Sequence, residues 1–194
     1  MKNEKRIVIC PVGLNGSGKG NVCRILVENH GFIFLSTSDV IRSVVKEHGL
    51  ECTRTNMGQV ANLTRTEHGK EYFASYLSAT MDISAHSYVV DGCRQVEEIE
   101  FLKNKYPGLV YVVKVFCDPR VRFDRMKVRN RTGDPSTFEE FLNADEIELG
   151  NVIAVNTMNY KACFELAMQQ VDNSGSVGEL ERNVEALLAE LYLS

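Results

Sequence analysis

A glycine-rich segment near the start of the chain has the spacing that binding of phosphates requires. Gly13, Gly18 and Lys19 fit the pattern G-x-x-x-x-G-K, between a β-rich apolar run and an expected helix. Glycines let successive backbone N–H groups point inward, the helix adds a positive dipole end, and the lysine adds a mobile charge. The residues expected to contact ATP here are Gly13, Asn15, Gly16, Ser17, Gly18, Lys19, Gly20 and Asn21. The alternative is a glycine-rich connection that binds no ligand.

The residue after the lysine departs from the commonest form of this loop. A serine or threonine usually follows, and its hydroxyl binds Mg²⁺. Here Gly20 and then Asn21 follow Lys19, so the usual hydroxyl ligand is missing. With glycine at this position, the loop resembles that of the adenylate kinase-like nucleoside monophosphate kinases.

Two further segments extend this resemblance to an acceptor site. The run Ser-Thr-Ser-Asp-Val-Ile-Arg at 36–42 looks like the segment with which those kinases hold the acceptor nucleotide. The resemblance implies that Thr37 lies near the acceptor base, that Arg42 grips its phosphate, and that Asp39 lies near the phosphates. Asp-Gly-Cys-Arg at 91–94 resembles the family's Asp-Gly-Phe-Pro-Arg, shortened by one residue. Asp91 would then order Mg²⁺ or its water, and Arg94 would be a second clamp on the acceptor phosphate.

The second half of the chain resembles the lid and the adenine loop of the same kinases. Arg125, Arg129 and Arg131 are similar to the arginines that open the mobile lid, which is short here, at about 129–137. The role of the nearby Arg122 stays open. Asn173 and Ser174 lie where the superfamily usually cradles adenine. The similarity is closest to the archaeal adenylate kinase-related and dephospho-CoA kinase-like group and spans nearly the whole chain, although 151–164 matches poorly.

The expected elements can bring these residues together. Strands alternate with helices, which predicts a mostly parallel sheet covered on both faces, with ligands beyond the carboxyl ends of the strands. We predict one α/β domain over 1–194, a three-layer P-loop NTPase fold with five strands, a short lid, and an acceptor-binding helical segment at about 37–82. Strands are expected at 6–12, 32–35, 87–91, 109–117 and about 168–171, and helices at 21–29, 40–48, 57–81 with a break near Gly69, and 95–106. Three more helices are expected after Asp118-Pro119, from a capping box at Ser136–Glu139, and from one at Ser176–Glu179.

Composition excludes several classes of protein. A net charge of −4 argues against a protein that coats DNA or RNA, and no apolar run approaches the roughly 18 residues of a membrane span. The amino-terminal apolar run is too short for a signal peptide. Six scattered cysteines without a Cys-x-x-Cys pair predict a reducing, cytoplasmic setting without disulfides or zinc. The sequence leaves open whether the chain is a monomer or a homodimer.

The expected activity is Mg²⁺-dependent transfer of the γ-phosphoryl group of ATP to a nucleoside monophosphate, a small-molecule acceptor. No catalytic base is required when the nucleophile is already a phosphate oxygen. Two alternatives remain: a dephospho-CoA kinase-like enzyme with Asp39 as base, or an adenylate kinase-like ATPase that acts as an assembly factor. Two groups of charged residues are interpreted as solvated helix faces: Glu67, His68 and Lys70, and Asp145, Glu146 and Glu148.

Overall fold

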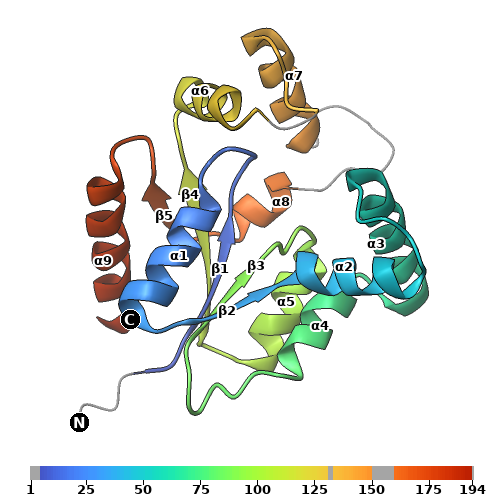
Figure 1. The fold of residues 1–194 in the computed structure, drawn as a ribbon. Coiled ribbons are helices and arrows are strands. Elements are labelled where there is room, and N and C mark those ends of the chain that lie inside the picture. Colours follow the sequence, from blue (N-terminus) through green and yellow to red (C-terminus); the bar gives the residue numbers. More distant parts are fainter. Residues whose placement is uncertain (1–4, 131–132, 150–159, 194) are drawn as a thin grey trace.

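Five short strands form one parallel sheet at the centre of the molecule (Figure 1). The structure, a computed structural model, describes residues 5–130, 133–149 and 160–193. The strand order is β2-β3-β1-β4-β5, and each pair of neighbours is parallel. The strands are β1 (Val8–Val12), β2 (Ile33–Ser36), β3 (Tyr88–Asp91), β4 (Val110–Phe116) and β5 (Gln169–Asp172). The predicted five-stranded α/β fold is confirmed.

Helices connect these strands and cover both faces of the sheet. They are α1 (Lys19–His30), α2 (Thr37–Glu47), α3 (Arg54–His68), α4 (Tyr72–Ser78), α5 (Val96–Lys105), α6 (Pro119–Arg129), α7 (Phe138–Glu148), α8 (Tyr160–Glu165) and α9 (Val177–Leu193). The predicted break at Gly69 separates α3 from α4, and its φ of 99° explains why the helix stops there. None of the described helices is long and apolar enough to cross a membrane.

Alternate residues of β1 face two separate cores. Ile7 and Ile9 pack with α1 and α9, whereas Val8 and Cys10 pack with α2, α4 and α5 on the other face. This alternation is the period of two that a strand buried on both sides must have. All six cysteines are free thiols, and Cys52 is the exposed one.

Side-chain caps set the start of several helices. Asp118 accepts hydrogen bonds from the first turn of α6, and Ser176 and Glu179 form the reciprocal bonds of a box at the start of α9, as predicted. The predicted box at Ser136–Glu139 is wrong by one residue. Thr137 is the N-cap of α7, and Glu140 closes the box. The Glu140 carboxylate also accepts from the N–H and hydroxyl of Ser136, so one glutamate serves two adjacent residues.

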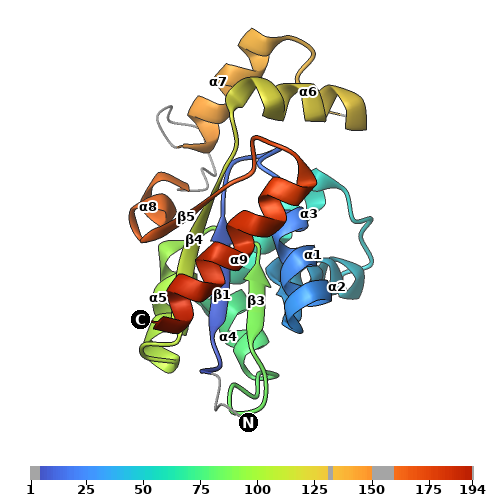
Figure 2. The ribbon, with the colours of Figure 1, turned by 90° about the vertical axis from the view of Figure 1, so that its left-hand side faces the viewer.

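Helices α6 and α7 form a separate layer beyond the carboxyl ends of the strands (Figures 1 and 2). They pack on each other through their own hydrophobic cluster of Phe123, Met126 and Phe141, with Phe138 against it; the three phenylalanines contact one another. Residues 130–137 connect them, where the short lid is expected. The phosphate loop and the turn after β3 reach the same end of the sheet, which brings Lys19, Asp91 and Arg94 to one region.

Candidate functional site

The loop between β1 and α1 has a backbone conformation that requires glycine at two positions. Gly16 has a φ of 79° and Gly18 a φ of 83°, in the left-handed region where a Cβ is disfavoured. A Cβ on Gly18 would also lie only 2.0 Å from Nδ2 of Asn173. Gly18 is the N-cap of α1, so the loop leads directly into the positive end of that helix dipole. The segment therefore has the geometry of an anion-binding loop.

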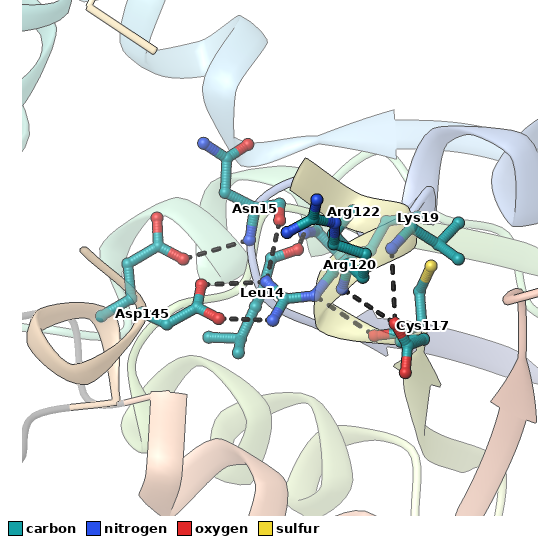
Figure 3. A network of polar contacts seen from close by, with 10 residues as sticks. Leu14, Asn15, Lys19, Cys117, Arg120, Arg122 and Asp145 are labelled. Carbon is teal, nitrogen blue, oxygen red and sulfur yellow. Dashed lines mark hydrogen bonds and ion pairs between the residues drawn. The ribbon is translucent and has the colours of Figure 1, made fainter. Parts of the chain in front are cut away.

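Lys19 folds back over this loop. Its Nζ donates to the carbonyl oxygen of Gly13 at 2.6 Å and to that of Leu14 at 3.4 Å (Figure 3). Burial lowers the pKa of Lys19, the carboxylate of Asp91 opposes this shift, and Arg94 adds to it. The ammonium group thus lies within electrostatic reach of both the phosphate loop and the turn after β3.

Asp91 and Ser17 each present a buried oxygen that lacks a partner. Oδ1 of Asp91, at the end of β3, and Oγ of Ser17, in the phosphate loop, accept or donate no hydrogen bond within the described residues. Oxygen ligands suit Mg²⁺, which is usually held by one or two carboxylates together with substrate phosphates. No group of three or more His, Cys, Asp or Glu residues in the described ranges is placed to hold a metal. The free oxygen of Asp91 therefore fits a Mg²⁺ ion that arrives with a nucleotide, whereas Ser17 lines a separate cavity between β4, α6 and α7.

The loop after β5 supports the phosphate loop from one side. Asn173 is buried, and its Nδ2 donates to the carbonyl oxygen of Ser17 at 2.8 Å. Ser174 follows, and its hydroxyl donates back to the end of β5. Arg125 reaches the same loop, where Nη2 donates to the carbonyl oxygen of Gly175 at 3.4 Å. Asn173 thus lies next to the phosphate loop, Ser174 bonds to Asp172 and to the backbone N–H of Asp118, and contact of either residue with adenine stays a prediction.

Of the other two predicted lid arginines, Arg129 reaches the phosphate loop. Its Nη2 donates to Oδ1 of Asn15 at 3.2 Å, while the guanidinium forms two hydrogen bonds, of 2.8 and 2.9 Å, with Asp134. The arginine is therefore held by a neighbouring carboxylate beside the loop. Arg131 lies outside the described residues.

A polar network joins α7 to the phosphate loop, contrary to the sequence interpretation (Figure 3). Asp145 is buried and forms a bidentate ion pair with Arg122, whose side chain also donates to the carbonyl oxygen of Asn15 at 3.2 Å. Glu148 accepts a hydrogen bond from the backbone N–H of Asn15 at 3.1 Å. The prediction of a solvated face at Asp145 and Glu148 is wrong, because α7 packs this face onto the loop.

The predicted acceptor segment divides into two parts. Thr37, at the start of α2, is fully buried, and its hydroxyl donates to the carbonyl oxygen of Gly92 at 2.8 Å. This bond ties α2 to the turn that contains Asp91. By contrast, Asp39 and Arg42 pair with each other on the exposed side of α2.

A cavity of ≈ 450 Å³ opens between α2, α3 and the turn after β3. This volume is in the range of small-molecule sites. Thr37 and Arg94 line it, whereas Asp39 and Arg42 do not, and α3 adds two further arginines, Arg54 and Arg65. No Asp or Glu is among the described residues that line it. Its other polar walls are Ser38, Thr55, Gln59 and Asn62. The cavity suits an anionic ligand.

Glu98 fixes two of the cavity arginines from behind. It is fully buried, and its carboxylate accepts from Nη2 of Arg65 at 3.0 Å and from the backbone N–H of Arg94 at 2.8 Å. The Arg65 guanidinium lies 4.9 Å from the ring centroid of Phe73, and its Nε has no partner within the described residues. The Arg65 guanidinium and the backbone of Arg94 are thus held in place by one buried carboxylate.

Comparison with known proteins identifies the family. The AAA domain family matches residues 12–142. The UPF0200 protein of Hyperthermus butylicus is 33% identical over 177 residues, which cover 89% of this chain and 92% of that protein. The UPF0200 protein of Thermococcus gammatolerans is 30% identical over 193 residues, 95% of each chain. The chain belongs to the UPF0200 family.

Solved structures place this UPF0200 chain among kinases in fold. A shikimate kinase from Acinetobacter baumannii in complex with shikimate matches with a TM-score of 0.60 at 19% identity, over 98% of this chain and 97% of that one. A gluconokinase from Sinorhizobium meliloti matches with a TM-score of 0.55 at 18% identity, over 99% and 96%. These findings confirm a P-loop kinase-like fold. The narrower adenylate kinase-like assignment stays a prediction.

Sequence reasoning missed Arg54, Arg65 and Glu98 as site residues. Arg65 and Glu98 are 33 positions apart, so no local pattern in the sequence indicates their ion pair. The local signal for the cluster is the polar side chains of α3, where Gln59 and Asn62 accompany Arg65; Arg54 precedes the helix that the sequence predicts from Met57.

Proposed function

We propose that this protein transfers the γ-phosphoryl group of ATP to a nucleoside monophosphate. The observation that carries the proposal is a cavity lined by three arginines and, among its described residues, by no carboxylate, next to a glycine-shaped phosphate loop. Two anionic substrates repel each other unless cations lie between them. Lys19 and Arg94 are close enough to affect one another electrostatically, which joins the two halves of the site.

On the donor side, backbone N–H groups of the loop and Lys19 would bind the phosphates of ATP, with the nucleoside towards Asn173. Asp91 would hold Mg²⁺, which neutralises charge on the phosphates when it is bound. Arg125 and Arg129 would contact the phosphates from above, and we propose the same for Arg131. The chain thus positions the donor and stabilises charge that develops on the transferring group.

On the acceptor side, the cavity favours a substrate whose nucleophile is already an anion. Arg94, Arg65 and Arg54 can make bidentate bonds to a phosphate. A hydroxyl acceptor would instead require a base to take its proton. Asp39 was the candidate base, and it lies outside the cavity in an ion pair with Arg42. A monophosphate acceptor therefore agrees better with this geometry than an alcohol.

Replacing Arg94 with alanine is expected to raise the KM for the acceptor about 10- to 100-fold, because a hydrogen bond to a charged group contributes about 1.5–3 kcal/mol. The KM for ATP should change much less. Steady-state kinetics with each substrate varied in turn measure both constants.

Arg42→Ala is the matched comparison, because it removes the same group from outside the cavity. We expect a smaller effect on the acceptor KM than for Arg94→Ala. A larger effect would mean that Arg42 leaves Asp39 and binds the acceptor phosphate, as the sequence resemblance implies.

The acceptor can be identified by a coupled assay of ADP release with ATP and Mg²⁺. The panel should contain ribo- and deoxyribonucleoside monophosphates, dephospho-CoA, shikimate and gluconate, the last two because of the structural neighbours. Rapid ADP formation only with a monophosphate supports the proposal, and turnover with a hydroxyl acceptor overturns it. Hydrolysis of ATP that is independent of any acceptor would favour an ATPase that acts as an assembly factor.

A further inference from the structure

The phosphate loop already holds an anion that belongs to the protein itself. Glu148, the last residue of α7, accepts a hydrogen bond from the backbone N–H of Asn15 through Oε2, at 3.1 Å. Asn15 lies within the G-x-x-x-x-G-K segment, whose N–H groups bind phosphates. A carboxylate oxygen and a phosphate oxygen cannot both occupy the position in front of one N–H group.

The surroundings of the Glu148 carboxylate are those expected for a transferred phosphoryl group. Arg129 reaches the same residue, with Nη2 3.2 Å from Oδ1 of Asn15. Besides the larger effect of Asp134, Glu148 helps to raise the pKa of Arg129. It also opposes, together with Asp91, the lowering of the pKa of Lys19 by burial. The carboxylate thus accepts from a loop N–H group and lies within electrostatic reach of the loop lysine and of a lid arginine.

Helix α7 is fixed in the position that brings Glu148 to the loop. Asp145 lies three residues earlier, and residues three apart share a helix face. Its buried ion pair with Arg122 anchors this face, and Arg122 also donates to the carbonyl oxygen of Asn15. The backbone of Asn15 is therefore bound to this anchored network at both its N–H and its C=O (Figure 3).

We propose that Glu148 occupies the position of the terminal phosphate in the nucleotide-free protein and thereby sets the relative affinity of the donor site for ATP and ADP. The inference rests on the proposed binding of ATP at this loop. The β-phosphate is expected nearer the start of α1, on the side of Asn173, whereas Asn15 faces α7 and the lid arginine. ATP must displace the carboxylate, and ADP, which lacks the terminal phosphate, leaves it in place. Only ATP binding therefore breaks the direct hydrogen bond between Glu148 and the loop, while the contact through Asp145 and Arg122 can remain.

The test compares nucleotide binding by the wild-type protein and by Glu148→Gln, which removes the charge and keeps the size of the side chain. A carboxylate that occupies the site multiplies the apparent affinity by the fraction of molecules in which the site is free. Removing its charge is therefore expected to tighten the binding of a non-hydrolysable ATP analogue about tenfold. Tripolyphosphate, which has no nucleoside, should also bind more tightly. The affinity for ADP should stay within about twofold. Isothermal titration calorimetry measures all three.

Glu139→Gln is the matched control, because Glu139 lies on the exposed side of the same helix, and it should change none of these affinities. Unchanged or weaker binding of the ATP analogue by Glu148→Gln overturns the inference, since the carboxylate would then not compete with phosphate. Equal tightening for ATP analogue and ADP overturns the assignment to the terminal phosphate. If the wild-type protein binds neither nucleotide, the proposed function itself fails, which is a different result from any of these. Thermal unfolding of each variant checks that the fold is intact.

Discussion

Lys19→Ala is expected to lower the rate of ATP-dependent phosphoryl transfer by at least about a thousandfold while the protein stays folded. Loss of one preorganised electrostatic contact lowers a rate by about 100- to 1,000-fold, and Lys19 would contact two phosphates. In the structure, its ammonium is held by loop carbonyl groups, at 2.6 Å from that of Gly13. These weak acceptors keep the ammonium beside the loop without neutralising it. Phosphate oxygens would then replace the carbonyl groups as its partners.

The measurement is the rate of ADP release with saturating ATP and acceptor. Lys46→Ala is a suitable control, because Lys46 is exposed near the end of α2, and it should retain full activity. Circular dichroism and thermal unfolding should show the same fold for both variants. Activity close to that of the wild type in Lys19→Ala would rule out the assignment of this loop as the phosphate-binding site.

Asp145→Ala is expected to destabilise the protein by about 3–5 kcal/mol, the usual cost of removing one partner from a buried ion pair. The side chains of Arg122 and Asp145 are only 4% and 11% exposed, so the arginine that remains would be a buried charge without its carboxylate. Urea unfolding monitored by far-UV circular dichroism measures the free energy of unfolding. The same change at the exposed Glu139 should cost much less. A loss below about 1 kcal/mol for Asp145→Ala would place the pair in the class of solvated surface ion pairs.

The sequence predicts those parts of the site whose residues lie in one continuous segment of the chain. Gly13–Lys19 combines two glycines with positive φ, a lysine and the start of a helix within a few residues, so the pattern itself contains the physical requirements of an anion site. Asp91 can be predicted from the sequence for a similar reason, because it directly follows a run of apolar residues that form a buried strand. The strands and most helix starts follow from period and capping in the same way.

The parts that sequence did not predict depend on pairs that are distant along the chain. Glu148 and Asn15 are 133 positions apart, and the Asp-Glu-Ile-Glu run around Glu148 is typical of a solvated helix. Its role becomes visible only when α7 is packed beside the loop. Arg42 illustrates the converse case, since a local motif placed it at the acceptor while the cavity has its arginines on α3 and on the turn after β3. Local patterns specify a chemical group, and packing decides what that group faces.

The separate hydrophobic cluster between α6 and α7 has a mechanical consequence. Phe123, Phe138 and Phe141 give these two helices cohesion that does not depend on the cores on either side of the sheet. We expect any displacement of the pair to move both helices together as one rigid body, with the sheet keeping its shape. Such a motion would first have to break the hydrogen bonds of Glu148 and Arg122 to Asn15 in the phosphate loop. The free energy of these bonds would therefore set the cost of moving the two helices when a ligand binds.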